Sequence, residues 1–134
     1  MKPHLRLLLT ALAMALPGGA LACGVCVEDK VAATYDHAVI RGAIERHQDV
    51  LFVAIEGADA AVIERRLAQA ARGLHGADAK TLRVSASPAA FSIAVDRSQA
   101  LDRVVGSLQA ALREPGAELT LVRVMRDGAL IEPK

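Results

Sequence analysis

The sequence predicts an α+β fold in which two helices cover one face of an antiparallel sheet. From residue 50 onward, apolar runs rich in β-branched residues alternate with segments whose apolar residues recur at helical spacing. The resulting order is strand, helix, strand, strand, helix, strand. This is the order of the βαββαβ, ferredoxin-like sandwich. Right-handed crossovers place its first and third strands in the middle, and these two runs are the most apolar.

A helix is expected before this domain, from Glu28 to about Arg46. Acidic residues at its start and basic residues at its end suit the helix dipole. Its apolar residues form one narrow stripe, Val27, Val31, Tyr35 and Ala38. We expect this N-terminal helix to dock on the open face of the sheet or on a partner.

The first half of the domain opens with residues 50–55, a continuous apolar run typical of a strand buried on both faces. Gly57 turns the chain, and Asp59 is a candidate N-cap for the next helix. That helix is expected to end at Gly76. Its apolar face is Ile63, Leu67, Ala70 and Leu74.

The second half begins with residues 81–86, which alternate as a half-exposed strand, and residues 89–95 return as a more buried one. Ser98 is expected to cap the second helix, which Pro115 and Gly116 end. Residues 118–125 form the last predicted strand.

The predicted organisation of the whole chain has four parts. They are a signal peptide (1–22), a C-x-x-C segment with the amphipathic helix (23–49), the ferredoxin-like domain (50–127) and a tail (128–134).

Residues 1–22 have the parts of a secretory signal. The segment opens with three positively charged or titratable residues, Lys2, His4 and Arg6. An apolar run at residues 7–16 follows, too short to anchor the chain across a bilayer. The small-x-small pattern at residues 20–22 predicts cleavage after Ala22. We therefore expect a periplasmic or secreted protein.

The alternative is a lipoprotein signal, in which the chain is cut before Cys23 and that sulfur is acylated. Such signals place Leu three residues before the cysteine, where this chain has Ala20, and Leu21 lies two residues before it. Lipidation would remove Cys23 from metal or disulfide chemistry. A membrane is expected as a partner only in this case.

The charge of the mature chain argues against nucleic acid as a partner. Losing Lys2 and Arg6 lowers the count of Lys and Arg from 16 to 14, against 15 Asp and Glu, so the net charge becomes about −1. Nucleic acids and anionic membranes both require clustered positive charge. The sequence shows no Ser/His/Asp arrangement, no carboxylate pair in an apolar setting and no phosphate-binding glycine loop. We do not expect an enzyme.

Cys23 and Cys26 are the only cysteines, and their C-x-x-C spacing lets two thiolates converge on one soft metal ion. Cu(I) accepts two sulfurs and needs no further ligand, whereas tetrahedral Zn(II) needs two more. The candidate extra ligands are His37, His47 and His75, which we interpret as surface or helix-end residues. On one continuous helix, Cys26 and His37 would lie about 16 Å apart along the axis. The pair therefore favours Cu(I) or a similar soft metal over a closed Zn(II) site.

Two other interpretations of the cysteine pair stay open. A C-x-x-C at a helix start favours the thiolate, which suits thiol–disulfide exchange with a partner. Alternatively, Cys23 and Cys26 form a structural disulfide in a non-catalytic interaction module, since an exported compartment is oxidising. A bridge over so short a loop would add little stability.

Three features suggest a known family: a strand ending in Gly57, the segment Leu74-His75-Gly76-Ala77 before a strand, and residues 91–96 ahead of the second helix. On these features the chain resembles the heavy-metal-associated domains of copper chaperones and copper-pumping ATPases. The resemblance implies a ferredoxin-like fold that passes copper to a protein partner.

The chain departs from this family at the metal site. The family places its metal-binding cysteines three and six residues past the loop glycine, where this chain has Ala60 and Ile63. Neither side chain can bind a soft metal. If the resemblance holds, the domain has either lost metal binding or works with Cys23 and Cys26 supplied from outside the fold. We expect the second, in a small exported carrier that hands metal or thiol equivalents to a protein partner.

Overall fold

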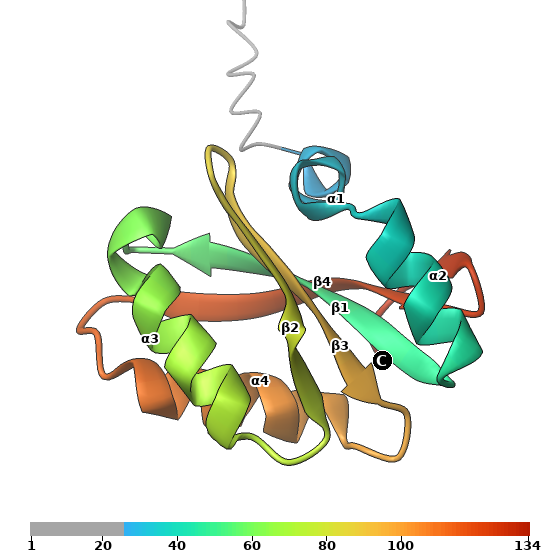
Figure 1. Cartoon of the computed structure of the whole chain (residues 1–134). Helices are drawn as coiled ribbons and strands as arrows, with labels where there is room; N and C mark the ends of the chain where they lie inside the picture. The colour runs from blue at the N-terminus through green and yellow to red at the C-terminus, as the bar shows by residue number, and fades with distance from the viewer. Residues whose placement is uncertain (1–25) are drawn as a thin grey trace, which may run out of the picture.

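The computed structural model describes residues 26–134, so the predicted signal peptide and Cys23 lie outside the described residues. The chain forms four helices and five strands in the part described (Figure 1). In chain order these are α1 (Val27–Thr34), α2 (His37–Glu45), β1 (Gln48–Glu56), α3 (Ala60–Gly73), β2 (Ala77–Ala86), β3 (Ala89–Asp96), α4 (Leu101–Leu112), β4 (Glu118–Arg126) and β5 (Ala129–Ile131).

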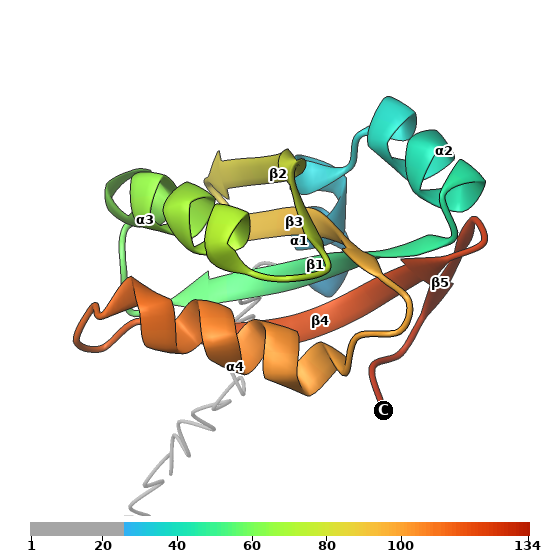
Figure 2. The same ribbon diagram turned by 60° about the horizontal axis from the view of Figure 1, so that its bottom comes forward.

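The strands form one sheet in the order β2-β3-β1-β4-β5, and every neighbouring pair is antiparallel. The predicted α+β class is confirmed, and the first and third strands, β1 and β3, are interior strands as expected. The order of β2, β3, β1 and β4 is compatible with a ferredoxin-like arrangement. Helices α3 and α4 lie on one side of the sheet, and α1 and α2 lie on the other (Figure 2).

The main core lies between the sheet and helices α3 and α4. Ile63 and Leu67 of α3 and Leu108 of α4 are at most 1% exposed, and the burial of Ile63 and Leu67 confirms the apolar face predicted for the first helix of the domain. Asp59 caps α3 as predicted, because its carboxylate accepts a hydrogen bond from the Ala61 N–H at 2.9 Å.

A second core fills the opposite face of the sheet. It brings residues of α1 and α2 onto β1, β3 and β4 through Val31, Val39, Ile40, Ala43, Val50, Phe52, Ala94 and Met125. Phe52 and Val50 are each 1% exposed. Because helices cover both faces of β1, its apolar residues run without alternation. The N-terminal segment therefore docks on the open face of the sheet, the first of the two surfaces expected for it.

The prediction of one continuous helix from Glu28 to Arg46 is wrong. The segment forms two helices, and the chain is extended at Tyr35 and Asp36 between them. Asp36 is the N-cap of α2 and accepts hydrogen bonds from the N–H groups of Ala38 and Val39, at 2.9 and 3.2 Å. Tyr35, expected on the apolar stripe, is 47% exposed.

Two side chains of the sheet hold this break in place. The buried Ser92 hydroxyl on β3 donates a hydrogen bond to the carbonyl oxygen of Thr34, the last residue of α1, at 2.7 Å. Arg83 on β2 donates to the Asp36 carboxylate at 2.8 Å. These bonds tie the end of α1 and the start of α2 to adjacent strands.

Two predictions in the C-terminal half are also wrong. Ser98 does not cap the second helix: its N–H and hydroxyl donate to the Asp96 carboxylate in the preceding turn, and α4 starts at Leu101. Residues 128–134 are not only a tail, because β5 pairs with β4 after the turn at Asp127 and Gly128. The sheet thus has five strands.

Edge strand β2 is longer than predicted and carries an irregularity between Asp78 and Arg83. The Thr81 hydroxyl stabilises this irregularity by donating to the Asp78 carbonyl at 2.6 Å and accepting from the Ala94 N–H at 2.8 Å.

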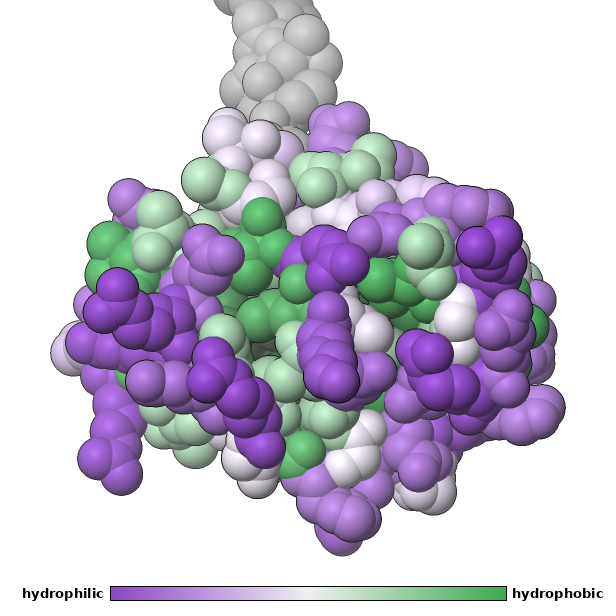
Figure 3. All heavy atoms as spheres, viewed as in Figure 1, coloured by the Kyte–Doolittle hydropathy of each residue, from purple (hydrophilic) through white to green (hydrophobic). Residues whose placement is uncertain are grey.

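Apolar residues show in the middle of the molecular surface drawn in Figure 3, inside a largely hydrophilic periphery. Leu82 and Val84 of β2 are partly buried against the main core.

A buried carboxylate holds one end of the sheet together. Asp49 on β1 is fully buried, and its oxygens accept hydrogen bonds from Arg126 at 3.0 Å and Arg97 at 3.2 Å. Arg97 also pairs with Asp127 at 2.8 Å. The bond to Asp127 raises the pKa of Arg97, and the bond to Asp49 raises the pKa of Arg126. The cluster joins β1, the loop after β3, and the β4–β5 turn.

Replacing Asp49 by Asn should destabilise the fold by about 3 kcal/mol, because two guanidinium groups would lose their buried partner. The guanidinium groups are partly exposed and can regain water, which keeps the loss near the lower end for a broken buried pair. Chemical denaturation measures the effect. The matched variant Asp127→Asn, on the exposed side of the same cluster, should cost far less; an equal loss for both would contradict this role of Asp49.

The Asp36 cap should give the fold an acid-sensitive element. Hydrogen bonds from the Val39 N–H and from Arg83 lower the pKa of Asp36 below its usual value. Its contribution to stability is therefore complete above the unfolded pKa of about 3.9 and is lost as the pH falls through the lower folded pKa.

Asp36→Asn should consequently lower the melting temperature at pH 7. The gap between wild type and variant should close as the pH is brought below about 4. Thermal unfolding followed by circular dichroism between pH 7 and pH 2 tests this. A gap that stays constant over the whole range would rule out the charge on Asp36 as the cause.

Candidate functional site

Cys26 stands at the N-cap position of α1 and is exposed. Its carbonyl oxygen accepts hydrogen bonds from the N–H groups of Asp29 and Lys30, at 3.0 and 3.3 Å, while its side chain makes no capping bond. The sulfur is therefore accessible to solvent, to a metal ion or to another thiol. Cys23 lies outside the described residues, so the metal pair and the disulfide predicted from Cys23 and Cys26 both stay predictions.

The predicted candidate histidines stand on three different segments of the fold. His37 is the first residue of α2, His47 lies in the turn before β1, and His75 lies in the turn between α3 and β2. All three are exposed, which agrees with their interpretation as surface or helix-end residues. Between residues 26 and 134, no group of three or more His, Cys, Asp or Glu side chains is arranged to hold a metal ion.

The loop position at which the resembled family binds metal is filled differently here. Ala60 and Ile63 lie on the first turns of α3 and are 1% and 0% exposed, packed in the main core. The loop glycine, Gly57, has φ of +71° and approaches the backbone of Gly116 so closely that a Cβ atom would lie 1.9 Å from the Gly116 carbonyl oxygen. These residues serve packing at this end of the sheet.

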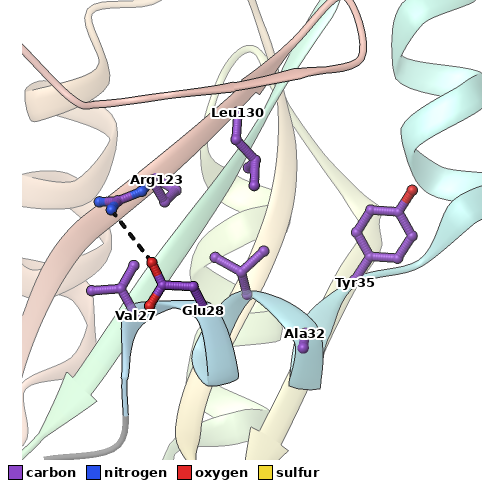
Figure 4. Close-up of a pocket in the computed structure, with 7 residues that line it drawn as sticks. Val27, Glu28, Ala32, Tyr35, Arg123 and Leu130 are labelled. Atoms are coloured by element: carbon purple, nitrogen blue, oxygen red, sulfur yellow. Dashed lines mark ion pairs between the residues drawn. The ribbon is translucent and has the colours of Figure 1, made fainter.

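A groove of about 380 Å³ adjoins the Cys26 end of α1, between that helix and the β4–β5 hairpin. We call it the α1–β5 groove (Figure 4). Its lining residues are Val27, Glu28, Val31, Ala32, Tyr35, Arg123 and Leu130. Tyr35 and Leu130 are 47% and 49% exposed. The walls are mainly apolar, and the wall formed by α1 begins with Val27, the residue after Cys26.

One side of the groove is charged. The Arg123 guanidinium on β4 lies 3.1 Å from Glu132 and 3.9 Å from Glu28. It also donates a hydrogen bond to the Val122 carbonyl oxygen at 2.7 Å, which orients it. The two glutamate side chains are 78% and 79% exposed, whereas that of Arg123 is 24% exposed.

Sequence reasoning missed this groove. Two signals for it were present: Arg123 interrupts an otherwise apolar stretch of the last strand, and Tyr35 is the only tyrosine. Neither shows that α1 lies beside the β4–β5 hairpin, because that arrangement joins residues about a hundred positions apart and depends on β5.

Comparisons with protein-family models, with curated proteins and with solved structures found no match. Within the described part of the chain, no helix is both long enough and apolar enough to span a membrane.

The exposure of Cys26 predicts rapid thiol chemistry in the folded protein. In a Cys23→Ser variant, the remaining Cys26 thiol should react with Ellman's reagent without denaturant. A matched control is Ala94→Cys in a chain lacking both native cysteines, since Ala94 is fully buried. That engineered thiol should react only after unfolding. Protection of Cys26 comparable to that of the buried thiol would contradict the geometry.

Proposed function

We propose that this chain is an exported carrier that binds one soft metal ion, Cu(I), through Cys23 and Cys26 and passes it to a protein partner. The observation that carries the proposal is the exposed Cys26 sulfur at the start of a helix docked on the sheet, with a second cysteine three residues before it. Thiolates select Cu(I) among available metals, and two of them complete its coordination.

The support beneath Cys26 suits a site that exchanges its ligand. Val31 packs into the second core, and Ser92 holds the other end of α1 through the Thr34 carbonyl. The helix is thus fixed, while Cys26 and the side chains of Glu28 and Asp29 in its first turn are exposed. A metal ion held there would be bound by an ordered element and would stay open to a competing thiol.

The ferredoxin-like fold and the exported location belong to the same proposal. The central strand order β2-β3-β1-β4 supports a βαββαβ sandwich, to which α1, α2 and β5 are added. The three-part pattern of residues 1–22 supports export to the periplasm or beyond the cell.

Thiol–disulfide exchange is the second candidate, and the position of Cys26 at a helix N-terminus favours it. The first-turn N–H groups of a helix attract negative charge, which stabilises a thiolate. Carboxylates of Glu28 and Asp29 in the same turn act in the opposite direction. Because the thiolate is also the metal ligand, these charges act on both functions alike. Metal binding is preferred because two thiolates alone complete the coordination of Cu(I).

Competition with a chromophoric Cu(I) chelator under anaerobic conditions tests the proposal. The reduced chain should withdraw one Cu(I) per molecule, and Cys23→Ser or Cys26→Ser should abolish this because a single thiolate remains. His37→Gln is the matched control and should bind as the wild type does, since His37 lies on α2.

Failure of the reduced chain to withdraw Cu(I) would refute the carrier. Equilibration in glutathione buffers then distinguishes the other functions. A pair that titrates within the range of redox-active proteins, about −120 to −270 mV, would indicate thiol–disulfide exchange. A pair that stays oxidised far below that range would indicate a structural bridge.

A further inference from the structure

The α1–β5 groove has the size and lining of a recognition site next to Cys26. We propose that it binds a segment of a protein partner that presents one large apolar side chain flanked by Lys or Arg. The role of this binding in metal transfer rests on the proposed function. Binding of the segment itself requires no metal.

The apolar part of the proposal follows from the groove walls. Val27, Val31 and Ala32 of α1 form one wall. Leu130 lies opposite α1, and Tyr35 lies beyond the end of that helix, as Figure 4 shows. A volume of about 380 Å³ is at the lower end of the range of small-molecule pockets, and it accommodates a Leu or Phe side chain with neighbouring backbone. Tyr35 and Leu130 are about half exposed, so a seated side chain would remove apolar surface from water.

The basic part follows from the charges. Glu28, Arg123 and Glu132 form a triad whose net charge is −1. Both carboxylates are nearly four-fifths exposed and have oxygens free to accept further N–H donors while they stay paired with Arg123. An acidic segment would have to displace both glutamates from Arg123, whereas a basic segment adds to the triad. The groove therefore discriminates in favour of positive charge.

The groove lies next to Cys26, which places a bound segment where metal transfer would occur. Val27 and Glu28, which line it, follow Cys26 directly in the chain. A partner segment seated there would bring its own metal-binding group next to the exposed sulfur. Recognition and transfer would then use neighbouring parts of α1.

Tyr35 provides a specific probe, because it is the only tyrosine and the chain has no tryptophan. Tyrosine fluorescence of the reduced, metal-free chain is measured during titration with three synthetic peptides that are acetylated and amidated at their ends. Their sequences are Lys-Lys-Leu-Lys-Lys, Glu-Glu-Leu-Glu-Glu and Lys-Lys-Ser-Lys-Lys. Only the first should give a saturable change, since only it has both the apolar side chain and the positive charge.

Variants test whether the change in Tyr35 fluorescence comes from peptide bound in the groove. The double change Glu28→Gln with Glu132→Gln should weaken binding of the basic leucine peptide about threefold to tenfold, as expected for losing two exposed charge pairs. Leu130→Ala should also weaken it. Glu118→Gln, a charge removed from the start of β4 outside the groove, should have no effect. Cys26→Ser should leave peptide binding intact while abolishing Cu(I) binding, so the two proposals fail separately.

Three results would overturn the inference. The first is an equal response to the basic and acidic leucine peptides. The second is a response that the groove variants leave unchanged. The third is a concentration-dependent change of Tyr35 fluorescence without peptide, accompanied by dimerisation in sedimentation. That result would identify a second copy of the chain as the occupant.

Discussion

Docking of α1 and α2 on the second face of the sheet is the constraint on which the rest of the structure depends. Without these helices, Val50, Phe52, Ala94 and Met125 would present an apolar sheet face to water. Burying a side chain such as Phe52 contributes roughly 1.5–3 kcal/mol. The same docking fixes where α1 begins, and so where the Cys26 sulfur is presented. It also forms one wall of the α1–β5 groove.

Polar bonds decide how this docking is arranged. Val27 and Val31 supply apolar contact, which has no direction, whereas the hydrogen bond from the Ser92 hydroxyl to the Thr34 carbonyl is directional and orients the end of α1. Arg83 then fixes Asp36, and Asp36 starts α2 in a new direction. The change of direction turns Tyr35 out of the apolar stripe and onto the lip of the groove. A candidate partner site thus results from an interruption in a helix.

Most of the sheet and its helices could be predicted because their signals are local. The apolar run of β1 and the Asp59 cap of α3 are legible within a few residues. The break between α1 and α2 at Tyr35 and Asp36 could not be predicted in this way. The residues that hold it lie 58 and 47 positions away in the sequence, on β3 and β2. Strand β5 has only three residues, too few for a period to appear.

The candidate site also has one part that local sequence predicts and another that depends on residues far apart in the chain. The C-x-x-C spacing is read directly from the sequence, and the soft-metal site proposed from it needs accessible sulfur; the Cys26 side of it is exposed. The burial of Asp49 could not be predicted, because a carboxylate beside an apolar run is typical of the exposed end of a strand. In the fold, two arginines distant in the sequence pair with this carboxylate. The groove was hidden because its walls come from both ends of the chain.

The most direct test of the account is the intact mass of the protein isolated anaerobically from copper-supplied cells, recorded under native and then denaturing conditions. A Cu(I) carrier should give a chain beginning at Cys23 that carries one copper in the native spectrum and two reduced thiols after denaturation. An oxidised, metal-free chain that also refuses Cu(I) after reduction would contradict it. So would a mass raised by acyl chains on Cys23, because that modification would remove one of the two proposed ligands.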